Sequence, residues 1–220
     1  SVIVSNLNDG PSCTWIEPAD GLVIGTGDDL PMAALLYDPD APAGAITQTL
    51  FYADTTNVIG AGAGYPTSVL TWLNVPLADG YTLSAVTWDD GGLSATSDTL
   101  CVILDGDGDG MPDGYEDRSD LDPDVPNGSE DDDSDGDLLH DYGEYIAGTR
   151  PNDPESVLLI EEVAFTNSGE VAIRFESVTG RAYSVETRDG MLDPAGWQPL
   201  VHGHQQAPAV RVQAEHAFDP

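Results

Sequence analysis

The 220-residue sequence contains no lysine, and its basic residues are six arginines against 40 aspartates and glutamates. The formal net charge is −34. Nucleic acids and anionic membrane surfaces are bound by lysine and arginine, so the charge balance excludes both as partners. The sequence also lacks a run of 18 apolar residues, and therefore predicts no transmembrane helix and no membrane insertion.

Patterns that carry catalysis are missing as well. The sequence has no G-x-S-x-G elbow, no H-E-x-x-H motif and no catalytic pairing of cysteine with histidine. His202 and His204 form a close pair, but a surface turn explains them better than a metal site. The many carboxylates offer any spacing for glycoside hydrolysis, and no pair is singled out. We therefore predict that the protein is not an enzyme.

One stretch, by contrast, has a regular pattern of carboxylates. Residues 105–116 read D-G-D-G-D-G-M-P-D-G-Y-E, which places carboxylates at positions one, three, five, nine and twelve of a twelve-residue loop. Calcium takes six to eight oxygen ligands, glycine at position six (Gly110) allows the sharp turn, and position seven offers its carbonyl. The predicted calcium ligands are Asp105, Asp107, Asp109, Met111, Asp113 and Glu116.

A second loop repeats the same five positions. Its predicted calcium ligands are Asp133, Asp135, Asp137, Asp141 and Glu144. Position six is Leu138 instead of glycine, so the geometry and affinity of this loop stay open. His140, at position eight, is expected to point away from the ion. A solvated acidic linker is the alternative, but two loops with identical spacing favour calcium. About one helical turn is expected after Asp113 and after Asp141.

The stretch from Asp105 to Pro154 resembles the thrombospondin type 3 class of calcium repeat in bacterial surface and secreted proteins. Besides both loops, the match includes E-Y-I-A-G-T-R-P-N-D-P at residues 144–154. Arg150 stands where aspartate is common. The resemblance implies Ca²⁺ as the bound ion and an extracellular or cell-surface location. No charged and then apolar leader opens the sequence, so Ser1 is expected to be a processed or trimmed start.

Residues 1–104 predict an all-β domain. Short runs of β-branched and aromatic residues alternate with turn-forming clusters, a spacing typical of a two-sheet sandwich. The predicted strands are Ser1–Leu7, Leu22–Gly25, Ala33–Tyr37, Thr47–Ala53, Val69–Asn74, Tyr81–Trp88 and Thr99–Leu104. Residues 15–21, 46–60 and 72–98 resemble a bacterial immunoglobulin-like domain. That family is a β-sandwich used as a spacer or adhesion module, and it implies no catalytic residues.

The only two cysteines, Cys13 and Cys101, flank the first and last strands of this domain. The terminal strands of such sandwiches run side by side, which suggests a disulfide between them. That bond would stabilise the fold by about 4–5 kcal/mol on the entropic model. Two buried free thiols are the alternative.

Residues 156–220 predict a second, smaller β-domain. Its predicted strands are Val157–Thr166, Glu170–Ser177, Ala182–Arg188, Trp197–Val201 and Ala209–Ala214. Residues 177–200 resemble the small C-terminal β-domains that follow such calcium repeats in bacterial surface proteins. One more apolar strand closes the sheet in that type, and this sequence does not contain it before Pro220. Ser1–Leu7, on the other hand, precedes residues 15–21, where the resemblance to the immunoglobulin-like domain begins, and is therefore an additional strand.

The sequence therefore predicts a mainly β protein in three parts: an immunoglobulin-like sandwich (1–104), a calcium-binding connector (105–155) and a smaller β-sandwich (156–220). A missing strand and a spare one suggest that copies join head to tail, each donating Ser1–Leu7 to the next. The result would be a fibre or surface structure; alternatively, this strand pairs within its own domain.

A second hypothesis is a spacer or carbohydrate-binding appendage of a larger secreted polysaccharide-active enzyme. Glycans would then be partners, and Trp15, Trp72 and Trp88 are candidates for sugar stacking. Packing within the sandwich is the preferred explanation for these three residues.

Overall fold

The structure is a computed structural model that describes residues 8–40, 46–165, 171–179, 181–188, 198–199 and 209–215. The chain divides into two compact units, one of residues 1–108 with 112–125, the other of residues 109–111 with 126–220. The predicted donor strand Ser1–Leu7 lies outside the described residues, as do His202 and His204. No described helix has the length and apolar character needed to cross a membrane.

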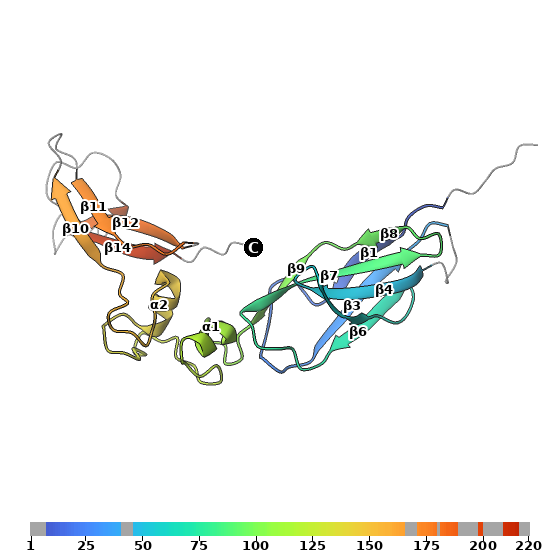
Figure 1. Ribbon diagram of the computed structural model, residues 1–220, viewed down its shortest axis with the longest axis horizontal. Coiled ribbons are helices and arrows are strands. Elements are labelled where there is room, and N and C mark those ends of the chain that lie inside the picture. The colour runs from blue at the N-terminus through green and yellow to red at the C-terminus, as the bar shows by residue number, and fades with distance from the viewer. Residues whose placement is uncertain are drawn as a thin grey trace, which may run out of the picture. The chain divides into compact units, whose positions relative to one another are not determined.

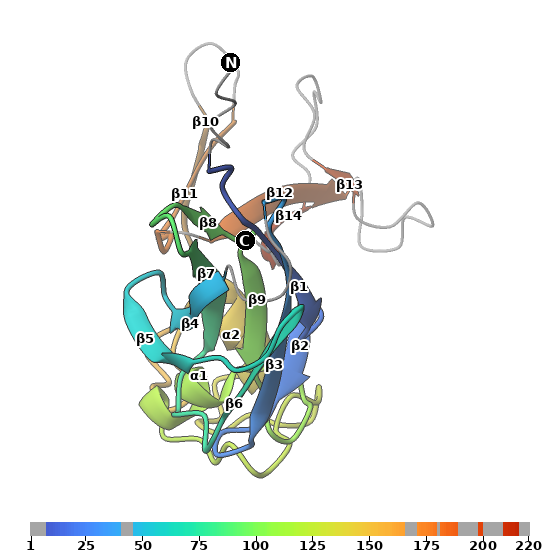
Figure 2. The ribbon, with the colours of Figure 1, turned by 90° about the vertical axis from the view of Figure 1, so that its right-hand side faces the viewer.

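The first unit is a sandwich of two sheets (Figure 1). One sheet has the antiparallel order β1 (Ser12–Glu17), β3 (Leu30–Tyr37), β6 (Thr67–Trp72). The other has the order β2 (Leu22–Ile24), β9 (Leu100–Leu104), β7 (Gly80–Asp89), β4 (Ile46–Ala53), β5 (Asn57–Ala61), and β8 (Ser94–Thr96) pairs with β7. In Figure 2, β7, β4 and β5 lie on one side of this unit, with β4 between the other two, and β1 and β3 lie on the other side. The predicted immunoglobulin-like β-sandwich is confirmed.

Alternating side chains from both sheets form the core of this sandwich. On β3, Leu30, Met32, Ala34 and Leu36 are buried, while Pro31, Leu35 and Tyr37 are exposed. On β4, the fully buried Phe51 approaches Trp15 of β1 with ring centroids 5.6 Å apart. This period of two follows from the pleat, because successive side chains of a strand point to opposite faces. Trp15 and Trp72 pack against this core, which agrees with the explanation preferred over sugar stacking for these two residues.

Three strands of the sandwich were not predicted: β1, β5 and β8. Strand β5 contains Gly60, and β8 has three residues, so neither gives a clear alternation. The six predicted strands that fall on described residues of this unit are present, with ends that differ by up to three residues.

The predicted disulfide between Cys13 and Cys101 is wrong, because both thiols are free. Cys13 lies on β1 and faces the core, where burial raises the pKa of its thiol to about 11. Cys101 lies on β9 in the other sheet, between the buried Leu100 and Val102, so its side chain faces outward. The chain crosses between sheets after β1, and therefore β2, and not β1, pairs with β9.

The second unit contains the C-terminal strands. β10 (Ile160–Phe165) pairs with β11 (Val171–Phe175), and β12 (Ala182–Arg188) pairs with both β13 (Gln198–Pro199) and β14 (Ala209–Glu215), all antiparallel. Each of the five strands predicted in residues 156–220 has its counterpart here.

Two short helices begin at position nine of the two acidic loops, where about one turn each was predicted. Helix α1 (Asp113–Arg118) belongs to the first unit, where the Gly114 N–H donates to the Ala78 carbonyl at 3.1 Å. Helix α2 (Asp141–Ala147) belongs to the second unit, where the Tyr183 hydroxyl donates to the Ala147 carbonyl at 2.7 Å. The first helix is therefore attached to the sandwich and the second to the C-terminal strands. The predicted division with residues 105–155 as one connector stays a prediction.

Candidate metal centres

Two groups of three aspartates gather their carboxylate oxygens. In the first loop, one oxygen each of Asp105, Asp107 and Asp109 lie within 4.8 Å of one another. In the second loop, Asp133, Asp135 and Asp137 do the same. These are positions one, three and five of both predicted loops, so the structure brings together the residues that the spacing selected.

The aspartate at position one holds the turn of each loop. The Gly108 N–H donates to Asp105 Oδ1 at 2.7 Å, and the Gly136 N–H donates to Asp133 Oδ1 at the same distance. Gly108 and Gly136 have φ of 78° and 81°, in the left-handed region that glycine adopts readily. Position four is therefore glycine in both loops for the same conformational reason.

The aspartate at position five fixes the next turn in the same way. The Met111 N–H donates to Asp109 Oδ1 at 2.8 Å, and the Leu139 N–H donates to Asp137 Oδ1 at 2.7 Å. Asparagine and aspartate favour such turns because their side chains accept from the backbone two residues on. Met111 and Leu139 thus hold the position-seven carbonyl in equivalent places of the two loops.

The carboxylates at position nine are buried and bind protein donors. Asp113 accepts from the Gly106 N–H at 2.6 Å and from the Thr26 N–H at 2.8 Å. Asp141 accepts from the N–H of Ser134 at 2.9 Å and from its hydroxyl at 2.7 Å. Both side chains therefore tie the second residue of the loop to the start of the following helix. Their role as direct ligands stays a prediction, since position nine often reaches calcium through water.

The glutamates at position twelve, Glu116 and Glu144, are completely buried. In the second loop, Asp135 Oδ2, Asp137 Oδ2 and both carboxylate oxygens of Glu144 are buried without a hydrogen-bond partner. Burial raises the pKa of Glu144 to about 8, and the neighbouring aspartates add to this rise. The Thr149 hydroxyl opposes the rise but does not reach hydrogen-bond geometry. Buried carboxylates without donors are costly unless a cation accompanies them.

The donor set of both loops fits Ca²⁺, a hard cation that prefers oxygen ligands. The first ion would be held by Asp105, Asp107, Asp109, Glu116 and the Met111 carbonyl, the second by Asp133, Asp135, Asp137, Glu144 and the Leu139 carbonyl. A bound ion would neutralise the clustered carboxylates and cross-link each loop to the helix that follows it.

The two loops differ at position six. Gly110 has φ of 97°, and Leu138 adopts φ of 84° in the equivalent place. The left-handed region costs a residue with a Cβ about 1–2 kcal/mol. The Leu138 side chain does not recover this cost by packing, because 94% of its surface is exposed. The turn expected at position six thus forms in the second loop without glycine.

Several residues that support the two loops cannot be identified from the spacing of the predicted calcium ligands. The Asn127 N–H donates to Asp109 Oδ2 at 2.8 Å, and a Cβ on Gly128 would meet the Asp109 carbonyl at 2.6 Å. His140 caps α2, where its Nδ1 accepts from the Gly143 N–H at 2.7 Å. The Leu139 carbonyl was not predicted as a ligand, although counting from Met111 in the first loop would have identified it.

No protein-family model matches the sequence, and no curated protein matches it. Among solved structures, the fibronectin(III)-like modules of Clostridium thermocellum CbhA share 18% identity over 42% of this chain and 93% of that one, with a TM-score of 0.35. The titin domains z1z2 in complex with telethonin share 17% identity over 46% of this chain and 50% of that one, with a TM-score of 0.34. This chain thus spans half of the titin fragment. At these values the similarity concerns the β-fold and carries no argument about function.

Proposed function

We propose that the protein is a non-enzymatic, calcium-stabilised structural protein that acts outside a bacterial cell. The observation that carries this proposal is the set of four buried, unpartnered carboxylate oxygens in the second loop, two on Glu144 and one each on Asp135 and Asp137 of the aspartate triad. Calcium sites of extracellular modules have a Kd of about 10⁻⁴–10⁻³ M, so that calcium at millimolar concentration outside the cell fills them.

The proposed role of calcium is to hold each loop against the helix that begins in it. In the first unit, Asp113 connects the loop to Thr26 and Arg118 forms an ion pair with Asp79 at 2.9 Å. In the second unit, the Arg181 guanidinium, one residue before β12, lies 5.0 Å from the Tyr145 ring centroid, and Tyr183 of β12 donates to the Ala147 carbonyl of α2. A net charge of −34 works against compactness, and bound divalent ions offset part of that repulsion.

We further propose that copies join head to tail by strand donation from Ser1–Leu7. This segment carries no charged side chain and alternates Val2 and Val4 with Ile3 and Ser5. Among the described strands, β10 pairs only with β11, which leaves an edge that an added strand can extend. The donor and acceptor surfaces differ, and such heterologous contacts build open filaments.

Electron microscopy of the chain in millimolar calcium tests this proposal, with a parallel sample that lacks Ser1–Leu7. We expect filaments from the complete chain and single particles from the shortened one. Monodisperse particles in both samples would overturn strand donation and leave the calcium-stabilised module.

A glycan-binding appendage is the second candidate, and one surface favours it. Gln48 faces Trp88 across β4 and β7, and Tyr52 faces Ser84, so Tyr52 and Trp88 share one face of the larger sheet. Both rings are half-buried, and no charged side chain lies between them on these two strands. Screening of neutral polysaccharides against the chain and a Trp88→Ala variant checks this candidate; equal retention of both proteins would remove it.

A further inference from the structure

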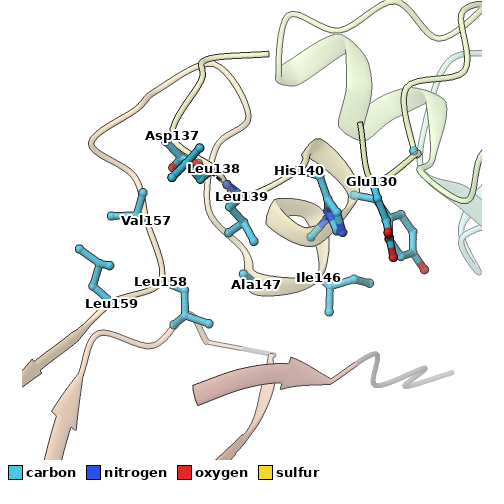
Figure 3. Close-up of a pocket in the computed structure, with 13 residues that line it drawn as sticks. Glu130, Asp137, Leu138, Leu139, His140, Ile146, Ala147, Val157, Leu158 and Leu159 are labelled. Atoms are coloured by element: carbon cyan, nitrogen blue, oxygen red, sulfur yellow. Dashed lines mark hydrogen bonds between the residues drawn. The ribbon is translucent and has the colours of Figure 1, made fainter. Parts of the chain in front are cut away.

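An apolar hollow of about 640 Å³ lies in the second unit, between the second loop, α2 and the segment that leads into β10 (Figure 3). Leu138 and Leu139 line it from the loop, Ile146 and Ala147 from the helix, and Val157, Leu158 and Leu159 from the segment before β10. Two carboxylates, Glu130 and Asp137, belong to the same lining.

The turn of the second loop does not explain why a leucine, Leu138, stands at position six. Glycine serves the same turn in the first loop, whereas Leu138 holds a left-handed φ and leaves 94% of its surface exposed. Strain of this kind is characteristic of functional positions. Leu159, on the segment before β10, is also 60% exposed. These two leucines offer apolar surface to an incoming chain.

The backbone beside the hollow is open to an added strand. Within the described part of the chain, no backbone hydrogen bond reaches Val157, Leu158 or Leu159. The ladder begins at Ile160, where β10 pairs with β11 on one side. An extended peptide along this segment would satisfy the backbone groups and direct every second side chain into the hollow.

We propose that the hollow is the acceptor for residues Ser1–Leu7 of a second copy of this chain, with Leu138 as an anchor of the contact. The proposal rests on the strand donation proposed above and names its receiving site. The acidic lining, next to Asp131, Asp132 and Asp133, repels anionic segments, and Ser1–Leu7 has no charged side chain. Val2 and Val4 point to the same face of an extended strand, as filling one hollow requires.

Calcium takes part in this contact because the second loop forms one wall of the hollow. Loss of the ion leaves the clustered carboxylates to repel one another and removes the constraint on Leu138. Binding of the donor segment therefore depends on calcium in the second loop. The first loop contributes no residue to the hollow.

The test uses a fluorescent peptide with the sequence of Ser1–Leu7 and the chain lacking those residues, in millimolar calcium. The variants are Leu138→Gly and Leu159→Ser, with Leu73→Ser as a matched control, because Leu73 is 61% exposed on the other unit. We expect each of the first two to weaken peptide binding about tenfold or more, as for the loss of one buried leucine. The control should bind as the parent does, and a chelator should abolish binding.

Leu138→Gly separates an anchoring role from a structural one. Relief of the backbone strain should raise the thermal stability of this variant in calcium while its peptide affinity falls. Unchanged peptide binding by both Leu138→Gly and Leu159→Ser would overturn the assignment of the hollow. If those variants still assemble into filaments in the complete chain, strand donation survives at another edge. Peptide binding without filaments from the complete chain would keep the acceptor site and overturn the proposed fibre.

Discussion

The two acidic loops share the arrangement of their first five positions and diverge at the sixth. Asp105 and Asp133 accept from the glycine three residues on at the same distance, and the aspartates at position nine accept from the second residue of their loop. Gly110 turns the first loop without strain, whereas Leu138 turns the second at a cost. The carboxylate spacing therefore sets the arrangement of the aspartates, and position six is free to carry another role.

The loops also differ in what surrounds them. The first is attached to the sandwich through Thr26 and Ala78, and the second to the C-terminal strands through Tyr183. Hydrogen bonds therefore connect the same loop pattern to two different β-structures.

Removal of calcium should have the largest effect, because both loops lose an ion at once. A site filled at 100 times its Kd contributes about 2.7 kcal/mol to the free energy of unfolding. We expect a clear drop in thermal midpoint when a chelator is added, and recovery when calcium is restored. An unchanged melting curve would count against a structural role for either loop.

Loss of ligands from one loop should mainly affect the helix that begins in that loop. Asp105→Ala with Asp109→Ala should increase hydrogen exchange in α1, and Asp133→Ala with Asp137→Ala should do so in α2. The reason is that each loop is bonded to the helix that follows it. Hydrogen-exchange mass spectrometry of separate segments measures this, and equal changes in α1 and α2 for either variant would contradict an independent role for each loop.

Exchange of the residues at position six should shift stability in opposite directions. Leu138→Gly removes a left-handed leucine and should stabilise the chain by about 1–2 kcal/mol, offset by about 0.4–1 kcal/mol through the greater backbone freedom of glycine in the unfolded chain. Gly110→Leu should destabilise by at least as much, because a Cβ there meets Tyr142 at 3.2 Å. Denaturant unfolding in calcium measures both. A destabilising Leu138→Gly would show that this leucine packs in the loop.

The smallest effect is expected from loss of the hydrogen bond between the Ser134 hydroxyl and Asp141, which braces the second loop. Ser134→Ala removes the hydroxyl that donates to Asp141 and should cost about 0.5–1.5 kcal/mol. Gly106→Ala is the matched change in the first loop, where position two has no side-chain donor and the Thr26 N–H serves instead. Its added Cβ meets no atom closer than 3.5 Å, so no brace is lost. Equal losses for both changes would mean that the serine brace is unimportant.

The sequence predicts those features that depend on local spacing. Carboxylates at alternate positions and glycine at position four specify the aspartate triads, and period-two alternation specifies strands such as β3 and β7. Contacts between distant residues carry no such signal. The support of Asp109 by Asn127 and Gly128 is one example, and the separation of Cys13 from Cys101 is another, because it depends on where the chain crosses between sheets. Strand β5 was missed because Gly60 interrupts its pattern.

Native mass spectrometry of the intact chain and of the two double-aspartate variants counts the bound calcium ions. We expect two calcium ions per intact chain and one in each variant, Asp105→Ala with Asp109→Ala and Asp133→Ala with Asp137→Ala. An intact chain that binds no calcium, or variants that retain both ions, would contradict the assignment of one calcium ion to each loop.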